Sequence, residues 1–372
     1  TTSSVMIDRY LLKKNKISFN KFGYDDYSFW LKVLKKTKYS FLIDEYLTIY
    51  NTNHNLVSKN KDRLGGIETL NLELSRNLSL NKYKVYLSTV CKKIIKKNNL
   101  VNIPISKIKK NYDKYKFDCI ISSNDPNIFN YFKNSKKILW MHNTLAIEKA
   151  FRKRKLFSIL NNKINAVFVS KYLNKNTSKL YNFKSRIVIP NFLEKRFENQ
   201  KIQNKRKPWI IWSVSREKGL YETINMWKNI IKLYPKMQFH IFGVKKFNNK
   251  KKLKKYNIYF HNRVSKDILI KYYKKSLASL CLGYDETFCL NALEANACGL
   301  PVISFGKTAL KDLISHNKNG IIVKNFDEIA KTIIRIIELN DKKKKRLIST
   351  CYNHSKKYTI NKIINSWQNL LR

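Results

Sequence analysis

From Leu64 onward, short apolar runs of strand length alternate with segments in which apolar residues recur at helical spacing. This alternation is typical of a parallel sheet covered by helices, so it predicts an α/β fold. In the second half, strands are expected at 209–214, 237–244, 258–260, 278–282, 301–305 and 321–323. The helices expected between and after them include 220–233, 289–297 and one that begins at Lys266 with Ser265 as its N-cap. A strand–helix unit repeated about six times predicts a Rossmann-like lobe.

The region before this lobe carries a less regular version of the same pattern. Strands are expected there at 84–88, 117–122, 137–141, 166–170 and 186–189. They predict a second, smaller Rossmann-like lobe. A polar, basic stretch at 194–207, which ends at Pro208, is a candidate for the linker between the two lobes. Substrates of such two-lobed proteins bind in the cleft.

Residues 1–60 do not follow the strand–helix alternation. They hold a Phe-Gly-Tyr-Asp-Asp-Tyr turn, an aromatic helix start and then a polar, Asn-rich stretch that is typical of a linker. The first residue is Thr, and strand-like sequence (SSVMI) follows at once. We expect this part to be a separate piece and the chain to be the downstream part of a longer polypeptide.

The charge of the chain is strongly positive. Lys and Arg number 76 against 25 Asp and Glu, a formal net charge of +51 that attracts any polyanion: nucleic acid, anionic lipid or a phosphorylated substrate. Because Lys, Asn and Ile are abundant in almost every segment, a codon bias toward A and T is an alternative explanation. The KKKKR run at 342–346 is typical of a solvated helix face.

Cysteine usage and hydropathy bear on the compartment. The six cysteines form no CxxC pair and have no His at ligand spacing, so neither a zinc site nor a disulfide framework is indicated. No uncharged apolar run approaches the roughly 20 residues of a spanning helix. We therefore expect a cytoplasmic protein with no metal, either free or peripheral on the inner face of the cell membrane.

The segment YDETFCLNALEANACGLPVISF carries the clearest chemistry. Its carboxylates Glu286 and Glu294 stand seven residues apart, the first in a loop and the second in the helix that follows. If that helix begins near Phe288, the backbone amides of Phe288, Cys289 and Leu290 form an anion site at its positive end. One carboxylate then accepts from sugar hydroxyls and the other from a ribose. The alternative is an amphipathic helix with two incidental glutamates.

This segment, the Ala-Cys-Gly-Leu-Pro-Val-Ile strand entry and the Asn-Gly-Ile-Ile-Val of 319–323 together resemble the donor-binding half of family 4 retaining glycosyltransferases. The resemblance implies a GT-B fold of two Rossmann-like lobes and a nucleotide-sugar donor, with neither metal nor other cofactor. It also implies that Glu294 holds the ribose, that Glu286 contacts the donor sugar and that the amides of 288–290 meet phosphate. The family often has Gly where Cys289 stands.

Upstream, WSVSREKGLYETI resembles the basic loop of the same family, in which one Arg and one Lys pair with the two donor phosphates. Lys218 stands at the Lys position, before Gly219. The usual Gly-Arg pair is replaced by Trp212 and Ser213, so Arg216 is the expected substitute. Preorganised cations stabilise a departing diphosphate as its charge grows. In a chain this basic, plain surface charge is the alternative for both side chains.

Two further positions match the family pattern. Gly65 and Gly66 of GGIETL resemble the glycine loop that approaches the donor, where adjacent glycines allow close backbone contact. An apolar first strand should precede them, but the preceding residues are polar (SKNKDR). His142, after the apolar run ILWM, matches a His near the donor sugar, where a neutral imidazole can bond a hydroxyl or support developing charge. An ordinary turn and a structural His are the alternatives.

Residues 1–60 resemble the C-terminal end of a family 2, GT-A-type glycosyltransferase. By that resemblance Asp26, beside Asp25, is the candidate base that deprotonates an acceptor. The nucleotide-binding half and its Asp-x-Asp metal motif are missing from this chain, so the remnant cannot be active alone. A plain acidic turn that caps a helix at Tyr27 is the alternative.

The combined prediction is a GT-A remnant (1–60), a GT-B acceptor lobe (61–200) and a donor lobe (201–372). The expected enzyme transfers a sugar with retention to a cell-envelope glycan, such as lipopolysaccharide, or to a lipid-linked acceptor. Its catalytic candidates are His142, Arg216, Lys218 and Glu286. The alternatives are an inactive glycosyltransferase-like scaffold and a basic nucleic-acid-binding protein, although no nucleic-acid motif is present. A glycoside hydrolase would need its carboxylates on either side of a scissile bond.

Overall fold

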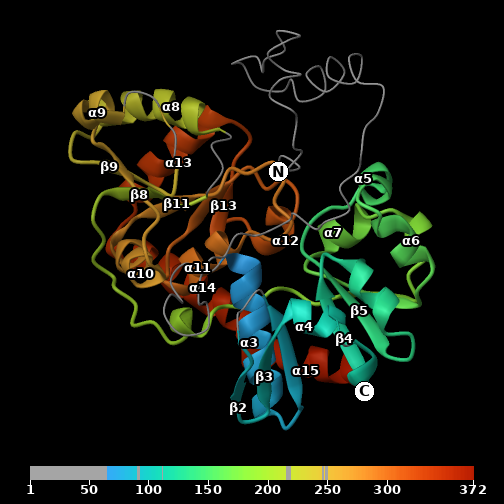
Figure 1. The fold of residues 1–372 in the computed structure, drawn as a ribbon. Helices are drawn as coiled ribbons and strands as arrows, with labels where there is room; N and C mark the ends of the chain where they lie inside the picture. The colour runs from blue at the N-terminus through green and yellow to red at the C-terminus, as the bar shows by residue number, and fades with distance from the viewer. Residues whose placement is uncertain (1–64, 90–92, 111, 215–218, 245–246, 248–249) are drawn as a thin grey trace, which may run out of the picture. The chain divides into compact units, whose positions relative to one another are not determined.

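The computed structural model describes residues 65–372 except for 90–92, 111, 215–218, 245–246 and 248–249 (Figure 1). The predicted GT-A remnant with its candidate base Asp26 lies outside the described residues, as do Arg216 and Lys218 of the basic loop. Within the described residues, no helix is both long enough and apolar enough to span a membrane.

The C-terminal part is built on a parallel sheet of six strands within the described residues, and all six lie at predicted positions. They are β8 (Trp209–Trp212), β9 (Gln238–Phe242), β10 (Ile258–His261), β11 (Ala278–Leu280), β12 (Val302–Ser304) and β13 (Gly320–Ile322). Their order across the sheet is β10-β9-β8-β11-β12-β13. Most of their residues are buried, as expected of a parallel sheet with both faces covered. This order is that of the Rossmann fold, as the strand–helix repeat predicted.

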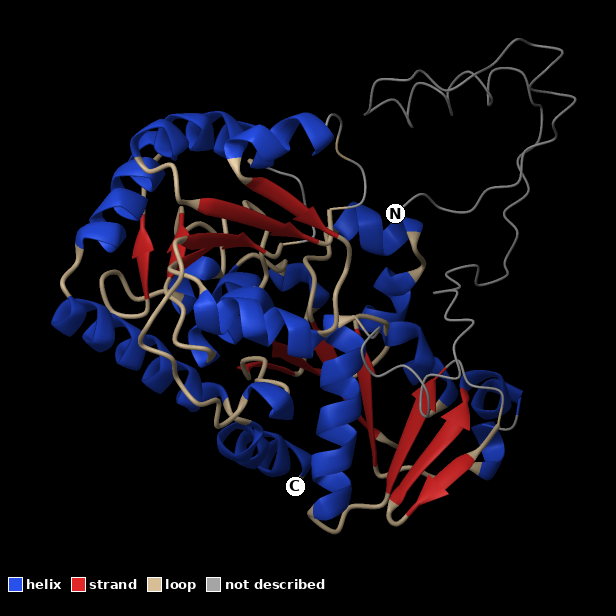
Figure 2. Ribbon diagram, turned by 90° about the vertical axis from the view of Figure 1, so that its left-hand side faces the viewer, coloured by secondary structure: helices blue, strands red, loops and turns tan. Residues whose placement is uncertain are grey.

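Helices cover both faces of this sheet (Figure 2). Helices α8 (Leu220–Leu233) and α13 (Phe326–Glu338) lie together on one face, and α10 (Lys266–Lys275), α11 (Leu290–Ala297) and α14 (Asp341–Ser355) lie on the other (Figure 1). The shorter helices are α9 (Lys250–Leu253) and α12 (Leu310–Leu313). The predicted N-cap Ser265 is present, since its hydroxyl accepts from the amide of Ile268 at 3.4 Å.

The N-terminal part holds two smaller sheets. One is parallel, in the order β4 (Cys119–Ser123), β5 (Lys136–Met141), β6 (Ile164–Phe168), β7 (Ser185–Val188). The other has the order β1 (Val85–Thr89), β3 (Leu100–Pro104), β2 (Ile95–Lys97), with β2 antiparallel. The helices of this part are α3 (Gly66–Leu80), α4 (Ile105–Lys110), α5 (Ile147–Arg152), α6 (Lys155–Leu160) and α7 (Lys171–Lys175). The pattern missed β2, because this strand is short and fully exposed and therefore lacks an apolar face to recognise. It also missed β3, whose short apolar run is interrupted by Asn102 and ends at Pro104, although the strand is largely buried.

The C-terminal helix α15 (Ile360–Leu371) packs beside α3, so the end of the chain returns to the N-terminal part (Figure 1). Its buried Trp367 meets Trp140 of β5 edge-on, with the ring centroids 4.9 Å apart. Aromatic pairs in this geometry add stability beyond the area they bury. The helix therefore ties the two ends of the described chain together.

Arg206, in the predicted linker, is half-buried and bonds four main-chain carbonyls. Its guanidinium donates to the carbonyls of Tyr273 and Lys274 at 2.8 and 2.7 Å, and to those of Cys298 and Gly299 at 3.1 and 3.2 Å. These carbonyls belong to the C-terminal ends of α10 and α11, where no intrahelical donor remains. Burial lowers the pKa of Arg206 to about 10, so the side chain keeps its charge at neutral pH.

We predict that Arg206→Ala lowers the free energy of unfolding by about 2–4 kcal/mol, because several buried carbonyls lose their donor. Urea denaturation followed by circular dichroism measures the loss. The exposed Arg335 on α13 is a matched control, and Arg335→Ala should change stability by no more than about 0.5 kcal/mol. Equal effects of the two substitutions would contradict a structural role for Arg206.

Two histidines on neighbouring strands share a hydrogen bond. Nδ1 of His240 (β9) lies 2.9 Å from Nε2 of His261 (β10), and Nε2 of His240 lies 3.1 Å from the side-chain oxygen of Gln238. A bond between two imidazoles requires that one of the facing nitrogens carries no proton. Burial, and then the charge of His261, lower the pKa of His240 to about 4.

The pair should make folding stability pH-dependent. Because the folded pKa of His240 lies below the ordinary value near 6.5, the unfolded chain binds more protons between about pH 6.5 and 4, and stability falls as pH decreases through that range. We predict that the Tm difference between the parent and His240→Gln, measured by calorimetry, narrows as pH falls from about 7.5 to 5. A Tm difference that stays constant over this pH range would refute the lowered pKa assigned to His240.

Candidate functional site

The strand order of the C-terminal sheet places a topological switch point between β8 and β11. The chain leaves β8 toward β9 on one side and leaves β11 toward β12 on the other, so the connections diverge at this point. In open α/β sheets, ligands bind at the carboxyl ends of the strands at such a switch point. The side chain of Asn291, on α11, donates to the carbonyl of Ser213 after β8 at 2.9 Å and thereby joins the two flanking loops.

The loop after β11 carries Glu286 and is shaped by Gly283. A Cβ on Gly283 would lie 2.8 Å from Cγ and 3.0 Å from Oε1 of Glu286, so the carboxylate occupies the space that the glycine leaves free. The carbonyl of Glu286 accepts from the amide of Ala309 at 3.1 Å. The loop is therefore fixed on the side of β12, with the Glu286 side chain folded back toward Gly283.

Helix α11 begins at Leu290, two residues later than the predicted start near Phe288. The reason is Cys289, whose φ of 70° is left-handed and cannot continue a helix toward Phe288. Gly adopts this conformation without strain, which accounts for the Gly that the family 4 pattern often has at this position. As the first helical residue, Leu290 has an amide without an intrahelical acceptor, at the positive end of the helix dipole.

Glu294 lies on the second turn of α11 and is only 5% exposed. Both of its oxygens accept from Nζ of Lys266, at 2.5 and 2.6 Å. Burial raises the pKa of Glu294, and the charge of Lys266 lowers it. The motif pointed to Glu294, but nothing in the sequence pattern singled out Lys266, which stands 28 positions earlier.

The predicted glycine loop meets the donor helix. Gly66 opens α3, and a Cβ on it would lie 2.9 Å from Cδ1 of Leu290. A small cavity of about 30 Å³ lies next to this contact. It is lined by Gly66, Thr69, Leu70 and Glu73 of α3, by Phe192, Leu193 and Glu194, and by Lys266, Leu290 and Glu294. Gly66 and Glu294, which are far apart in sequence, therefore share one cavity.

His142 follows β5 and lies near the Glu286 loop, because its carbonyl accepts from the hydroxyl of Thr287 at 2.6 Å. The imidazole is 4% exposed, packs 4.4 Å from the Trp140 ring and has no partner for Nε2 among the described residues. Burial lowers the pKa of His142 to about 3, so the ring is neutral at physiological pH. It can form one hydrogen bond to a ligand but does not carry positive charge.

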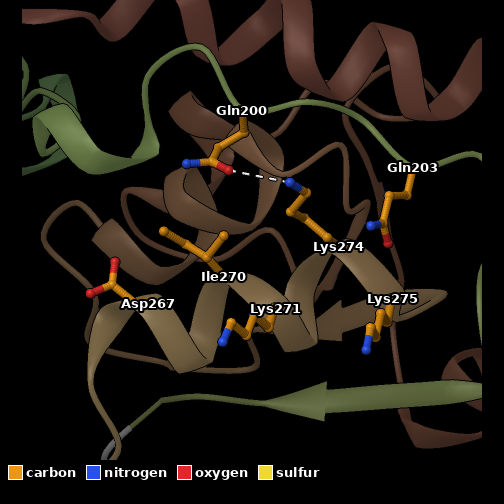
Figure 3. Close-up of a pocket in the computed structure, with 7 residues that line it drawn as sticks. All are labelled: Gln200, Gln203, Asp267, Ile270, Lys271, Lys274 and Lys275. Carbon is orange, nitrogen blue, oxygen red and sulfur yellow. Dashed lines mark hydrogen bonds between the residues drawn. The ribbon is translucent and has the colours of Figure 1, made fainter.

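A groove lies on α10, away from this switch point. It measures about 320 Å³ between α10 and the segment that follows Phe197 (Figure 3). Its walls are Gln200, Gln203, Asp267, Ile270, Lys271, Lys274 and Lys275. Lys274 donates to Gln200 across it at 3.4 Å. None of the predicted site residues lines this groove. Nor do the described residues hold a cluster of three or more His, Cys, Asp or Glu side chains that could bind a metal.

Residues 191–354 match the family described as Glycosyl transferases group 1. This range includes the segments that follow β8 and β11, helix α11 and Lys266. This segment is a glycosyltransferase group 1 domain. The prediction of a glycosyltransferase is thereby confirmed at the level of the enzyme class, whereas the narrower assignment to family 4 stays a prediction. No curated protein matches the sequence significantly.

Solved structures support the fold. Sucrose-phosphate synthase from Thermosynechococcus elongatus has a TM-score of 0.64 and 17% identity, and the match covers 82% of this chain and 92% of that one. WaaG, a glycosyltransferase involved in lipopolysaccharide biosynthesis, has a TM-score of 0.63, 11% identity and coverages of 83% and 96%. Anabaena HepE, solved with UDP and glucose, has a TM-score of 0.63, 14% identity and coverages of 84% and 97%. The predicted GT-B fold is confirmed.

Proposed function

We propose that this protein transfers a sugar from a nucleotide diphosphate-sugar, with retention of configuration, to a cell-envelope glycan or its lipid carrier. The observation that carries the proposal is the switch point between β8 and β11, after which Glu286, the start of α11 and Glu294 follow one another within a glycosyltransferase group 1 domain. Retention follows from the resemblance of the Glu286–Glu294 segment to family 4.

The donor roles divide along α11. Glu294, a buried carboxylate, accepts from the ribose hydroxyls, and Glu286 in the loop accepts from hydroxyls of the sugar. Between them, the amides of residues 288–290 at the positive end of α11 bind the diphosphate. This spacing matches the linear order of a nucleotide-sugar, in which the diphosphate separates the ribose from the transferred sugar.

The chemical step breaks the bond between the anomeric carbon and the diphosphate oxygen, and negative charge grows on the departing diphosphate. Lys218 and Arg216, which follow β8 in the sequence, are the cations proposed to stabilise that charge. His142, neutral and with an unpartnered Nε2, is proposed to bond a hydroxyl of the transferred sugar. The acceptor hydroxyl loses its proton as the new glycosidic bond forms.

The nature of donor and acceptor draws on two related folds. HepE was solved with UDP and glucose, which favours a UDP-sugar as the first donor to test. WaaG acts in lipopolysaccharide biosynthesis, which favours an envelope acceptor. The formal charge of +51 adds a physical reason, because a basic surface is attracted to anionic lipid, where lipid-linked acceptors reside. Peripheral association with the inner face of the membrane is part of the proposal.

We predict that Gly283→Ala weakens binding of UDP-glucose about five- to tenfold without loss of Tm. The added Cβ overlaps Glu286, whose flexible side chain moves away and thereby removes hydrogen bonds to the sugar. Isothermal titration calorimetry and thermal melting measure the two quantities. In an E286A background, which removes the overlapping side chain, the Gly283 substitution should have no further effect, and an additive loss would show that Gly283 acts elsewhere.

The proposal as a whole is tested by calorimetric titration of the parent chain with UDP, GDP, ADP and their glucose conjugates at roughly physiological ionic strength. We expect saturable binding of one nucleotide series and turnover of the matching sugar conjugate. In Glu294→Ala, the affinity for that series should fall at least about tenfold. Glu222→Ala, which removes an exposed carboxylate on α8, is the matched control for charge.

Equal, salt-sensitive binding of every nucleotide by the parent and both variants would mean that only net charge is being measured. That result, or saturable binding without any turnover across a panel of envelope acceptors, would replace the enzyme with an inactive scaffold.

A further inference from the structure

We propose that Lys266 is a positioning residue of the nucleotide site, which holds Glu294 as an oriented carboxylate for the vicinal hydroxyls of the ribose. The inference rests on the proposed function, because it adds a residue to the nucleotide site assigned there. Lys266 begins α10, and Glu294 lies on α11, so two adjacent elements on one face of the sheet build the pair.

The contact is symmetric. Nζ of Lys266 lies 2.5 Å from Oε1 and 2.6 Å from Oε2 of Glu294, so one ammonium bridges both oxygens and fixes the plane of the carboxylate. The Lys266 ammonium is itself held, since it lies 5.6 Å from the centroid of the Phe197 ring. Its side chain is 31% exposed, whereas that of Glu294 is only 6% exposed.

The pair leaves room for a diol. A carboxylate offers about four lone-pair positions, and the lysine takes one on each oxygen. The ammonium lies between the two oxygens, so the outer acceptor position of each oxygen remains for a ribose hydroxyl that donates. A protonated carboxyl loses this symmetry, because one oxygen then carries a hydrogen and becomes a poorer acceptor.

Burial makes the lysine necessary. A carboxylate that is nearly enclosed takes up a proton unless a counter-charge is close. The charge of Lys266 is the strongest influence that lowers the pKa of Glu294 against the effect of burial. The other ionisable groups do not replace it. Among the described groups that act on Glu294 or line its cavity, Arg196 is the other cation, and it is paired with Glu194 and Asp267. The remaining ionisable groups carry no positive charge: Glu73, Glu194, Tyr273 and Cys298.

The position of Lys266 goes against the local electrostatics of its helix. A cation at the first residue of a helix faces the positive end of the dipole, an unfavourable arrangement. Residues that violate a local rule are expected at functional sites, where another interaction offsets the cost. Here the offsetting interaction is the contact with Glu294.

The experiment titrates UDP, with GDP and ADP in parallel, into the parent, K266M, K266R and K271M between about pH 7 and 8.5. Affinities are expressed relative to the parent at each pH, so that titration of the nucleotide itself cancels. Lys271 lies on the same helix, lines the separate groove of Figure 3 and is a charge-matched control.

We expect K266M to bind about tenfold more weakly at pH 7 and to recover as pH rises, because Glu294 then ionises without help. K266R and K271M should stay within about threefold of the parent at every pH. E294Q should be weak without such recovery, and K266M/E294Q should be no weaker than E294Q alone, since the lysine acts through the carboxylate.

Two results would overturn the inference. K266M with the affinity and pH profile of K271M would show that the lysine contributes only surface charge. K266M/E294Q much weaker than E294Q would show that Lys266 contacts the nucleotide directly. If K266M does not fold, K266Q, which keeps a hydrogen-bond donor without charge, carries the same comparison. Failure of the parent to bind any of the three nucleotides would refute the proposed function as well, so the two failures are distinguishable.

Discussion

The reversal of strand order between β8 and β11 is the constraint on which the site depends. All six strands run parallel, so their carboxyl ends lie at one edge, and the connections diverge at the switch point between β8 and β11, the space where such sheets bind ligands. Glu286, the start of α11 and the loop after β8 belong to that space because of where their strands end. Asn291 then locks the two loops together through the carbonyl of Ser213.

Burial disfavours charge on the polar groups around this space, and their neighbours decide which of them stay ionised. Glu294 faces the ammonium of Lys266, and His142 stays neutral. At the far ends of α10 and α11, Arg206 keeps its charge while it bonds their last carbonyls. Desolvation penalises a charge unless a partner compensates it, so the neighbours decide which groups stay ionised. In a chain of formal charge +51, the number of lysines therefore says little, whereas the placement of one lysine beside a buried carboxylate says much.

Contacts across the chain complete the arrangement. Gly66 of α3 meets Leu290 of α11, and the hydroxyl of Thr287 bonds the carbonyl of His142. Helix α15 returns to α3, and Trp367 packs on Trp140 directly before the His142 strand ends. The residues named from separate motifs are thus neighbours because distant segments pack, not because their motifs adjoin.

The sequence by itself determined the α/β class, the six strands of the C-terminal sheet and the candidacy of Glu286, Glu294, Gly66 and His142, because buried parallel strands leave apolar runs and the motif lies in one continuous segment. It missed β2, whose residues are all exposed, and β3, whose apolar run is interrupted by Asn102. It also placed the start of α11 too early, because a left-handed Cys289 leaves no composition signal. Only the tertiary structure decided that Lys266 faces Glu294 and that His142 is enclosed. Pairing and burial arise from packing between segments far apart in the chain, and the spacing of residues along one segment cannot encode them.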